Sequence, residues 1–184
     1  MNIQRSLWLV AALALGFGTA MADDSGKAAK RQAEIDASAK TTLDNVLKDN
    51  ADIKELYGKA VGYAVFKVTK GGFIVSGGGG NGVAVDKATG KRTYMRMALG
   101  GIGLGIGGQR YELVVLFENK DRMEKFIAGG WDSSATAEAA AGKEGKAARS
   151  TFYDGVAYYQ ITDKGLMAHA DITGTKFWVN DELR

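Results

Sequence analysis

The stretch G-G-I-G-L-G-I-G-G, residues 100–108, restricts the fold of this chain more than any other segment. Successive side chains of a β-strand point to opposite faces, so a strand here would carry aliphatic side chains on one face only. The other face would be bare backbone, at Gly101, Gly103, Gly105 and Gly107. Glycine weakens a strand, so a regular row of glycines predicts close approach by another backbone, an aromatic ring or a ligand, or a sharp bend in the sheet.

The sequence after this run indicates where such a bend would lie. The glycine run continues through Gln109 and Arg110 into Y-E-L-V-V-L-F, residues 111–117. Large apolar residues occupy even-numbered positions before Gly107 and odd-numbered positions after it. If the segment is one long strand, this change of parity requires a bulge or corner, for which residues 107–108 are the obvious place. The expected result is a strongly curved sheet.

The rest of the chain predicts helices first and then mainly strands. Residues 23–57 show apolar residues at helical spacing, with a break over residues 49–52 and a second short helix over residues 53–59. The favoured interpretation is a helix that covers one side of a sheet. The alternative is an amphipathic segment that meets a membrane, which the balanced charge of the segment disfavours. A short helix over residues 119–128 has Asn119 or Asp121 as its cap and ends at residues 129–130.

Strands are expected over residues 61–68, 73–76, 83–85, 92–97, 111–117, 152–161, 166–173 and 175–179, whereas residues 131–149 fit either a loop or a strand of small residues. The order of elements predicts an α+β fold without alternating βαβ units. We expect a strongly bent, largely antiparallel, half-barrel-like sheet of seven or eight strands. An N-terminal helical region and one short helix would pack on it.

The first residues have the features of a secretion signal. One positive charge precedes an apolar run over residues 7–17, and the small-x-small motif A-M-A ends at Ala22. We expect cleavage after Ala22 and a periplasmic protein in three parts: a signal peptide over residues 1–22, a helical region over 23–59 and a bent-sheet domain over 60–184. The chain has no cysteine, which excludes disulfides and a lipid anchor on a mature N-terminal cysteine, so we do not expect a lipoprotein.

No motif in the sequence assembles a catalytic centre. Two matches to G-x-G-x-x-G, at residues 77–82 and 103–108, are followed by strand-like sequence, whereas a dinucleotide site needs a helix there. His169 is the only histidine, so a zinc site of the usual nitrogen and sulfur ligands cannot be built. We therefore expect no enzyme activity, no metal and no cofactor. The net charge of +3 is too small to indicate nucleic-acid binding.

One basic stretch, residues 87–96, stands out near the glycine-rich segments. Three further basic residues, Lys67, Lys70 and Arg110, could lie near it in the sheet. A basic rim beside a glycine and aliphatic surface suits an anionic lipid, whose headgroup would meet the charges. The alternative is a solvated rim of a hairpin. Aromatic residues at positions 131, 153, 158, 159 and 178 fit either an interfacial belt or the core. The candidate lipid-binding residues are Lys87, Lys91, Arg92, Arg96 and Arg110.

From about residue 60 to residue 179 the chain resembles the SYLF lipid-binding domain family, whose yeast members gave it the alternative name of an actin-binding domain. The resemblance rests on the strand at residues 112–117 and on three motifs: K-G-G-F-I-V-S-G-G-G-G-N-G-V (70–83), G-G-I-G-L-G-I-G-G-Q (100–109) and K-G-L-M-A-H-A-D-I-T-G-T (164–175). It implies phospholipid binding without catalysis, and the chain looks most like the exported bacterial branch.

These observations predict a periplasmic protein that recognises anionic phospholipid or a membrane surface through the basic rim. The alternative is a non-catalytic scaffold of the cell envelope that binds a protein or glycan partner, by the bare face of the glycine run or an exposed strand edge. The sequence leaves the lipid, the purpose of binding and the oligomeric state open.

Overall fold

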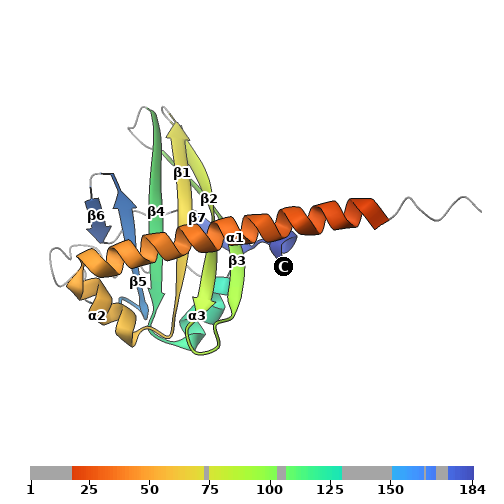
Figure 1. The fold of residues 1–184 in the computed structure, drawn as a ribbon. Coiled ribbons are helices and arrows are strands. Elements are labelled where there is room, and N and C mark those ends of the chain that lie inside the picture. Colours follow the sequence, from red (N-terminus) through yellow and green to blue (C-terminus); the bar gives the residue numbers. More distant parts are fainter. Residues whose placement is uncertain (1–17, 73–74, 103–106, 130–150, 164, 169–173) are drawn as a thin grey trace, which may run out of the picture.

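The computed structural model describes residues 18–72, 75–102, 107–129, 151–163, 165–168 and 174–184 (Figure 1). The described helices are α1 (Gly18–Asp49), α2 (Ala51–Lys59), α3 (Lys120–Ile127) and the short 3₁₀ helix η1 (Asp181–Leu183). The strands are β1 (Gly62–Gly72), β2 (Val75–Asp86), β3 (Arg92–Ile102), β4 (Gly107–Phe117), β5 (Val156–Thr162), β6 (Gly165–Ala168) and β7 (Thr175–Val179). This architecture confirms the predicted α+β class.

All seven described strands form one open antiparallel sheet in the order β6-β5-β4-β1-β2-β3-β7. The expectation of one long strand through residues 100–117 is wrong. Gly101 belongs to β3, which pairs with β2 and β7, whereas Gly107 begins β4, which pairs with β1 and β5. The parity of the apolar residues therefore changes because the chain moves to another strand, three places away in the sheet. Gly103 and Gly105 lie outside the described residues.

Both faces of the central strands are buried where α1 and α2 cover the sheet, as the apolar sequence of β1 predicts, whereas Lys67 and Thr69 farther along β1 are exposed. Phe66 and Val68 point into a core that contains α3, while Val65 points to the opposite face, which α1 and α2 cover. The helices contribute Ala39, Leu43, Val46, Ile53 and Leu56 to that second core. Burial of each Leu, Ile or Val side chain stabilises the fold by roughly 1.5–3 kcal/mol. The interpretation of the N-terminal helix as the cover of a sheet is confirmed.

The sheet curls strongly toward the face that carries α3. Phe66 of β1 and Phe177 of β7 have ring centroids 5.1 Å apart, although β2 and β3 separate their strands. In a flat sheet, three strand spacings of about 4.8 Å would hold these backbones about 14 Å apart. Phe126 of α3 contacts both rings, with centroids at 6.1 and 4.8 Å. The face with α3 is therefore concave, and the face under α1 is convex.

The curl depends on glycines of β2. A β-carbon at Gly82 would lie 2.5 Å from Cδ1 of Phe66, and one at Gly78 would lie 2.5 Å from the carbonyl oxygen of Thr69. Gly80 would likewise collide with the carbonyl oxygen of Lys67. The close approach that the sequence predicted for glycines is thus present, but at alternate positions of β2.

The helix boundaries follow the sequence signals. Asn50 separates α1 from α2, within the break predicted over residues 49–52. The side chain of Asn119 accepts a hydrogen bond from the backbone nitrogen of Arg122 at 3.0 Å, which caps α3 as expected. Gly129 follows α3 with a φ of 75°, a left-handed conformation that favours glycine at a helix end.

Candidate functional site

The candidate site is the part of the convex face that α1 leaves uncovered. In Figure 1, β4, β1 and β2 continue well beyond α1 on the side that faces the viewer. Directly paired residues of antiparallel strands share a face, so the register arranges the side chains in rows across the sheet. We call the uncovered rows the open face. It consists of Lys67, Thr69, Gly71, Gly77, Gly79, Asn81, Arg96, Ala98, Gly100, Gly108, Arg110, Glu112, Lys176 and Trp178.

The side chains in successive rows of the open face become smaller with distance from α1. The row nearest α1 contains Glu112, Lys67, Asn81, Arg96 and Trp178, and Ile161 of β5 continues it beyond Glu112. The second row contains Arg110, Thr69, Gly79, Ala98 and Lys176. The third row contains only glycine, at Gly108, Gly71, Gly77 and Gly100. Four of these side chains are cationic and one is acidic.

The glycine row is exposed backbone with free space above it. A β-carbon at Gly71 or Gly100 would meet no atom within 4 Å, and one at Gly77 or Gly108 would meet only a carbonyl oxygen at 4.0 Å. These glycines therefore differ from Gly78, Gly80 and Gly82 on the concave face. Nothing in the protein's own described structure requires a missing side chain along this row, which leaves a flat surface that a ligand can approach.

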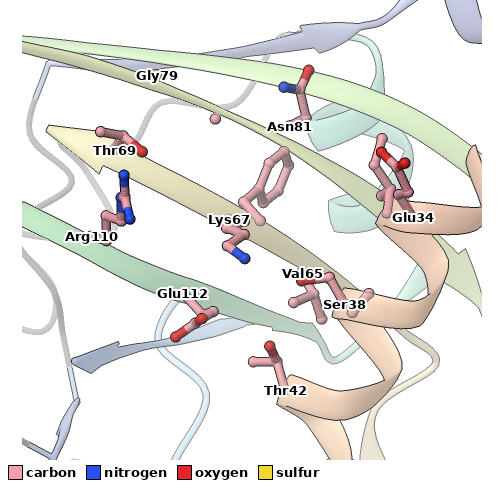
Figure 2. Close-up of a pocket in the computed structure, with 14 residues that line it drawn as sticks. Glu34, Ser38, Thr42, Val65, Lys67, Thr69, Gly79, Asn81, Arg110 and Glu112 are labelled. Carbon is pink, nitrogen blue, oxygen red and sulfur yellow. The ribbon is translucent and has the colours of Figure 1, made fainter. Parts of the chain in front are cut away.

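A groove of about 600 Å³ lies where α1 meets the open face (Figure 2). It adjoins a second groove of about 440 Å³ that shares Ser38, Thr42, Lys67 and Glu112 and reaches Ile161 of β5. The polar lining of the first groove comes from Glu34, Ser38 and Thr42 on α1 and from Lys67, Thr69, Asn81, Arg110 and Glu112 on the sheet. The groove thus presents two cations, two carboxylates and several hydroxyl groups.

Four of the lining residues form a square on neighbouring strands. Lys67 is paired with Glu112 and Thr69 with Arg110 in the register of β1 and β4. Lys67 and Arg110 are consequently diagonal neighbours, within reach of one another for long side chains. Among the residues that the structure describes, neither Lys67, Arg110 nor Glu112 forms an ion pair within the protein, so these three charged side chains remain available to a ligand.

Polar contacts fix the wall of the groove formed by α1. The Tyr94 hydroxyl donates to Oδ2 of Asp36 at 3.0 Å, and Nε2 of Gln32 donates to the carbonyl oxygen of Leu183 at 3.0 Å. Burial and then the hydrogen bond to Asp36 raise the pKa of Tyr94. Glu182 of η1 pairs with Arg96 at 2.6 Å and with Arg31 of α1 at 3.6 Å. These contacts join both sheet and C-terminus to the helix.

Lys87, one of the predicted lipid-binding residues, makes contacts that hold the fold together. Its Nζ donates to the carbonyl oxygens of Tyr57 and Ala60, at 2.6 and 2.9 Å, and lies 4.3 Å from the centre of the Tyr57 ring. These carbonyls belong to the end of α2, where a cation is favourable. Burial lowers the pKa of this lysine. The side chain therefore joins the hairpin between β2 and β3 to α2.

The remaining predicted basic residues do not form one cluster. Lys91 is exposed in the hairpin between β2 and β3, and Arg92 lies 3.5 Å from Oδ1 of Asp36. Arg96 is on the open face but is paired with Glu182. The rows of Arg92 and Arg110 lie about 20 Å apart along the strands, at about 3.3 Å per residue. Of the five residues, only Arg110 lines the groove.

The aromatic residues divide between core and surface. Tyr158 and Tyr159 are buried, whereas Trp178 is 41% exposed and stands on the open face beside Arg96. Trp131 lies outside the described residues. Of the groove residues, Lys67 was expected near the basic stretch, whereas Thr69 and Glu112 were not predicted as site residues. Their signal was the alternation of polar and apolar residues in β1 and β4.

Neither a membrane-spanning helix nor a metal site is found in the part of the chain that the structure describes. None of its helices combines the length and apolar composition needed to cross a bilayer. No group of three or more His, Cys, Asp or Glu side chains within the described ranges is placed to hold a metal ion.

Comparison with known proteins confirms the resemblance that the motifs predicted. Residues 98–183 match the Ysc84 family, described as "Las17-binding protein actin regulator". The matched residues run from β3 to η1, and the Ysc84 domain is also called SYLF.

Two relatives match at the level of sequence. Beta cell expansion factor A of Aeromonas veronii is 40% identical over 149 residues, which are 81% of this chain and 57% of that protein. The SH3 domain-containing YSC84-like protein 1 of Xenopus laevis is 36% identical over 76 residues, which are 39% of this chain and 23% of that protein. The chain thus spans little more than half the length of the bacterial relative and a smaller part of the other.

Proposed function

We propose that the protein is an exported phospholipid-binding protein that recognises anionic headgroups with its open face. The observation that carries this proposal is the composition of the face: four cationic side chains, one carboxylate and an exposed tryptophan lie on one side of a row of bare glycines. The family relation supports a lipid as the ligand class. The protein would act by binding, without catalysis, metal or cofactor.

The geometry suits a membrane surface. Each Lys or Arg held near an anionic bilayer contributes about 1 kcal/mol of attraction. Lys67, Arg110 and Lys176 stand in adjacent rows, and the glycine row beyond them places no side chain between backbone and ligand. Trp178, at the β7 edge of the same face, is the residue type that prefers the headgroup region of a bilayer.

The proposed location is the periplasm, after cleavage behind Ala22. The charged start, the apolar run and the A-M-A motif support this location.

The alternative is a scaffold that binds a protein partner. The description of the Ysc84 family, which names a protein-binding regulator, supports this alternative. Strand β7 forms one edge of the sheet and could pair with a strand of a partner. Lys176 on this edge disfavours such pairing, because a charged side chain is a common means of blocking an edge. We therefore place lipid binding first.

A vesicle flotation assay tests the proposal. Protein should float with phosphatidylcholine vesicles that contain phosphatidylglycerol and bind far more weakly to phosphatidylcholine alone. Binding should weaken with added salt, since exposed charges are screened over roughly 10 Å at 0.1 M. Absence of binding to both vesicle types, together with a protein partner that survives detergent in a pull-down from envelope extract, would favour the scaffold.

A further inference from the structure

We infer that the square formed by Lys67, Thr69, Arg110 and Glu112 recognises a phosphate ester that carries a primary amine, such as a phosphoethanolamine headgroup. For a lipid source, this inference rests on the proposed function, that the open face binds phospholipid, and it adds a zwitterionic headgroup to the anionic ones. Lys67, Thr69 and Arg110 would bind the phosphate, and Glu112 would bind the amine.

Phosphate recognition follows from the three donors. Lys67 and Arg110 are diagonal neighbours on β1 and β4, and Thr69 is paired directly with Arg110. Ammonium, guanidinium and hydroxyl groups on one face can donate to a single phosphate, and charge-assisted bonds of this kind are the strong ones. Figure 2 shows the Arg110 side chain standing beside Thr69, with Lys67 between Arg110 and α1.

Amine recognition follows from the carboxylate at the fourth corner. Glu112 is paired with Lys67 and follows Arg110 on the same face of β4. A simple phosphate bound by Arg110 and Lys67 would be repelled by this carboxylate. A phosphate ester whose alcohol carries an ammonium group would be attracted, because its ammonium could lie next to the Glu112 carboxylate.

The α1 wall of the groove adds groups of the same kind. Glu34 contributes a second carboxylate, and Ser38 and Thr42 contribute hydroxyl groups to the lining. A primary ammonium has three N–H groups, and these oxygens can accept hydrogen bonds from them. A quaternary ammonium has none, so the groove should distinguish ethanolamine from choline although both headgroups are zwitterionic.

The test compares three vesicle compositions: phosphatidylcholine alone, phosphatidylcholine with phosphatidylethanolamine, and phosphatidylcholine with phosphatidylglycerol. The first two are uncharged overall, so their difference reports the primary amine. We expect phosphatidylethanolamine to raise the bound fraction about threefold over phosphatidylcholine, the size of effect of a partly exposed ion pair.

The variant Glu112→Gln separates the two parts of the ligand. It should abolish the gain from phosphatidylethanolamine while leaving binding to phosphatidylglycerol unchanged or stronger, because a negative charge has been removed. Glu124→Gln on α3, an exposed residue on the other side of the sheet, is the matched control and should behave as wild type. Thermal melts show whether each variant is folded.

Equal binding to phosphatidylethanolamine and phosphatidylcholine, or an equal loss on all vesicles in folded Glu112→Gln, would overturn the inference. Failure of the proposed function looks different, because phosphatidylglycerol vesicles would then bind no protein. Soluble glycerophosphoethanolamine distinguishes the sources: competition supports recognition of the free group, and phosphatidylethanolamine binding without competition supports recognition in the bilayer.

Discussion

The ring of Phe66 lies against the α-carbon of Gly82 on the neighbouring strand, where a β-carbon would come within 2.5 Å of the ring atom Cδ1. Because position 82 has no side chain, the ring can extend over β2 toward Phe177, with centroids 5.1 Å apart. This contact closes the concave face around Phe126. The same curl makes the opposite face, which carries the candidate site, convex.

Substitution of Gly82 by Ala should destabilise the protein. The added methyl group would collide with the Phe66 ring and the carbonyl oxygen of Val65, and overpacking of this kind costs about 1–3 kcal/mol. Urea denaturation measures the loss. The control is Gly77→Ala on the same strand, where the nearest atom lies at 4.0 Å and stability should be unchanged. Equal stability of the two variants would contradict the proposed basis of the curl.

Truncation of Phe126 to Ala should cost about 3–5 kcal/mol, the usual range for a large aromatic side chain in a core. Phe126 is fully buried and contacts Phe66, Phe117 and Phe177, which come from three different strands. Calorimetric unfolding of the variant checks this. A melting temperature within a few degrees of wild type would mean that α3 does not hold the concave face.

Replacement of Lys87 by Met should reduce stability without reducing lipid binding. The side chain donates two hydrogen bonds to the end of α2 and is partly exposed. We expect a loss of about 1.5 kcal/mol, the low end of the range for hydrogen bonds to charged groups. Lys91→Met in the same hairpin should leave both properties unchanged. A selective loss of binding in folded Lys87→Met would support the basic stretch as the lipid site instead.

Stability should fall at alkaline pH because buried tyrosines resist ionisation. Burial, more than the nearby Asp52, raises the pKa of Tyr159 far above its ordinary value of 10.0. A group whose pKa is raised by folding contributes stability that is fully present below pH 10 and is lost as the pH rises above it. The free energy of unfolding, measured by urea at pH 8 to 11.5, should decline less steeply in Tyr159→Phe. Parallel profiles would exclude this tyrosine as a cause.

The local features of the fold could be predicted from the sequence, and the long-range pairing could not. The break at Asn50 and the cap at Asn119 depend on neighbouring residues, so their signals are visible in the chain. The parity change after Gly107 predicts a corner if residues 100–117 form one strand. A change of strand gives the same pattern, and nothing local distinguishes the two.

The candidate site shows the same division. Arg110 was expected in it and is present, whereas Lys87 lies in the same basic stretch as Lys91 but turns toward α2. Charges that are close in sequence are not necessarily close in space. Lys67 and Glu112 become partners through the register of β1 and β4, which only the folded sheet defines.

Flotation of a double variant is the sharpest test of whether the open face binds anionic lipid. Lys67→Met with Arg110→Met should lower the affinity for phosphatidylglycerol vesicles by about 2 kcal/mol, which is about thirtyfold. Lys91→Met with Lys120→Met removes the same charge from the opposite end of the sheet and should bind as wild type. Equal losses in the two folded double variants, or no loss in the first, would mean that the open face is not the site of lipid binding.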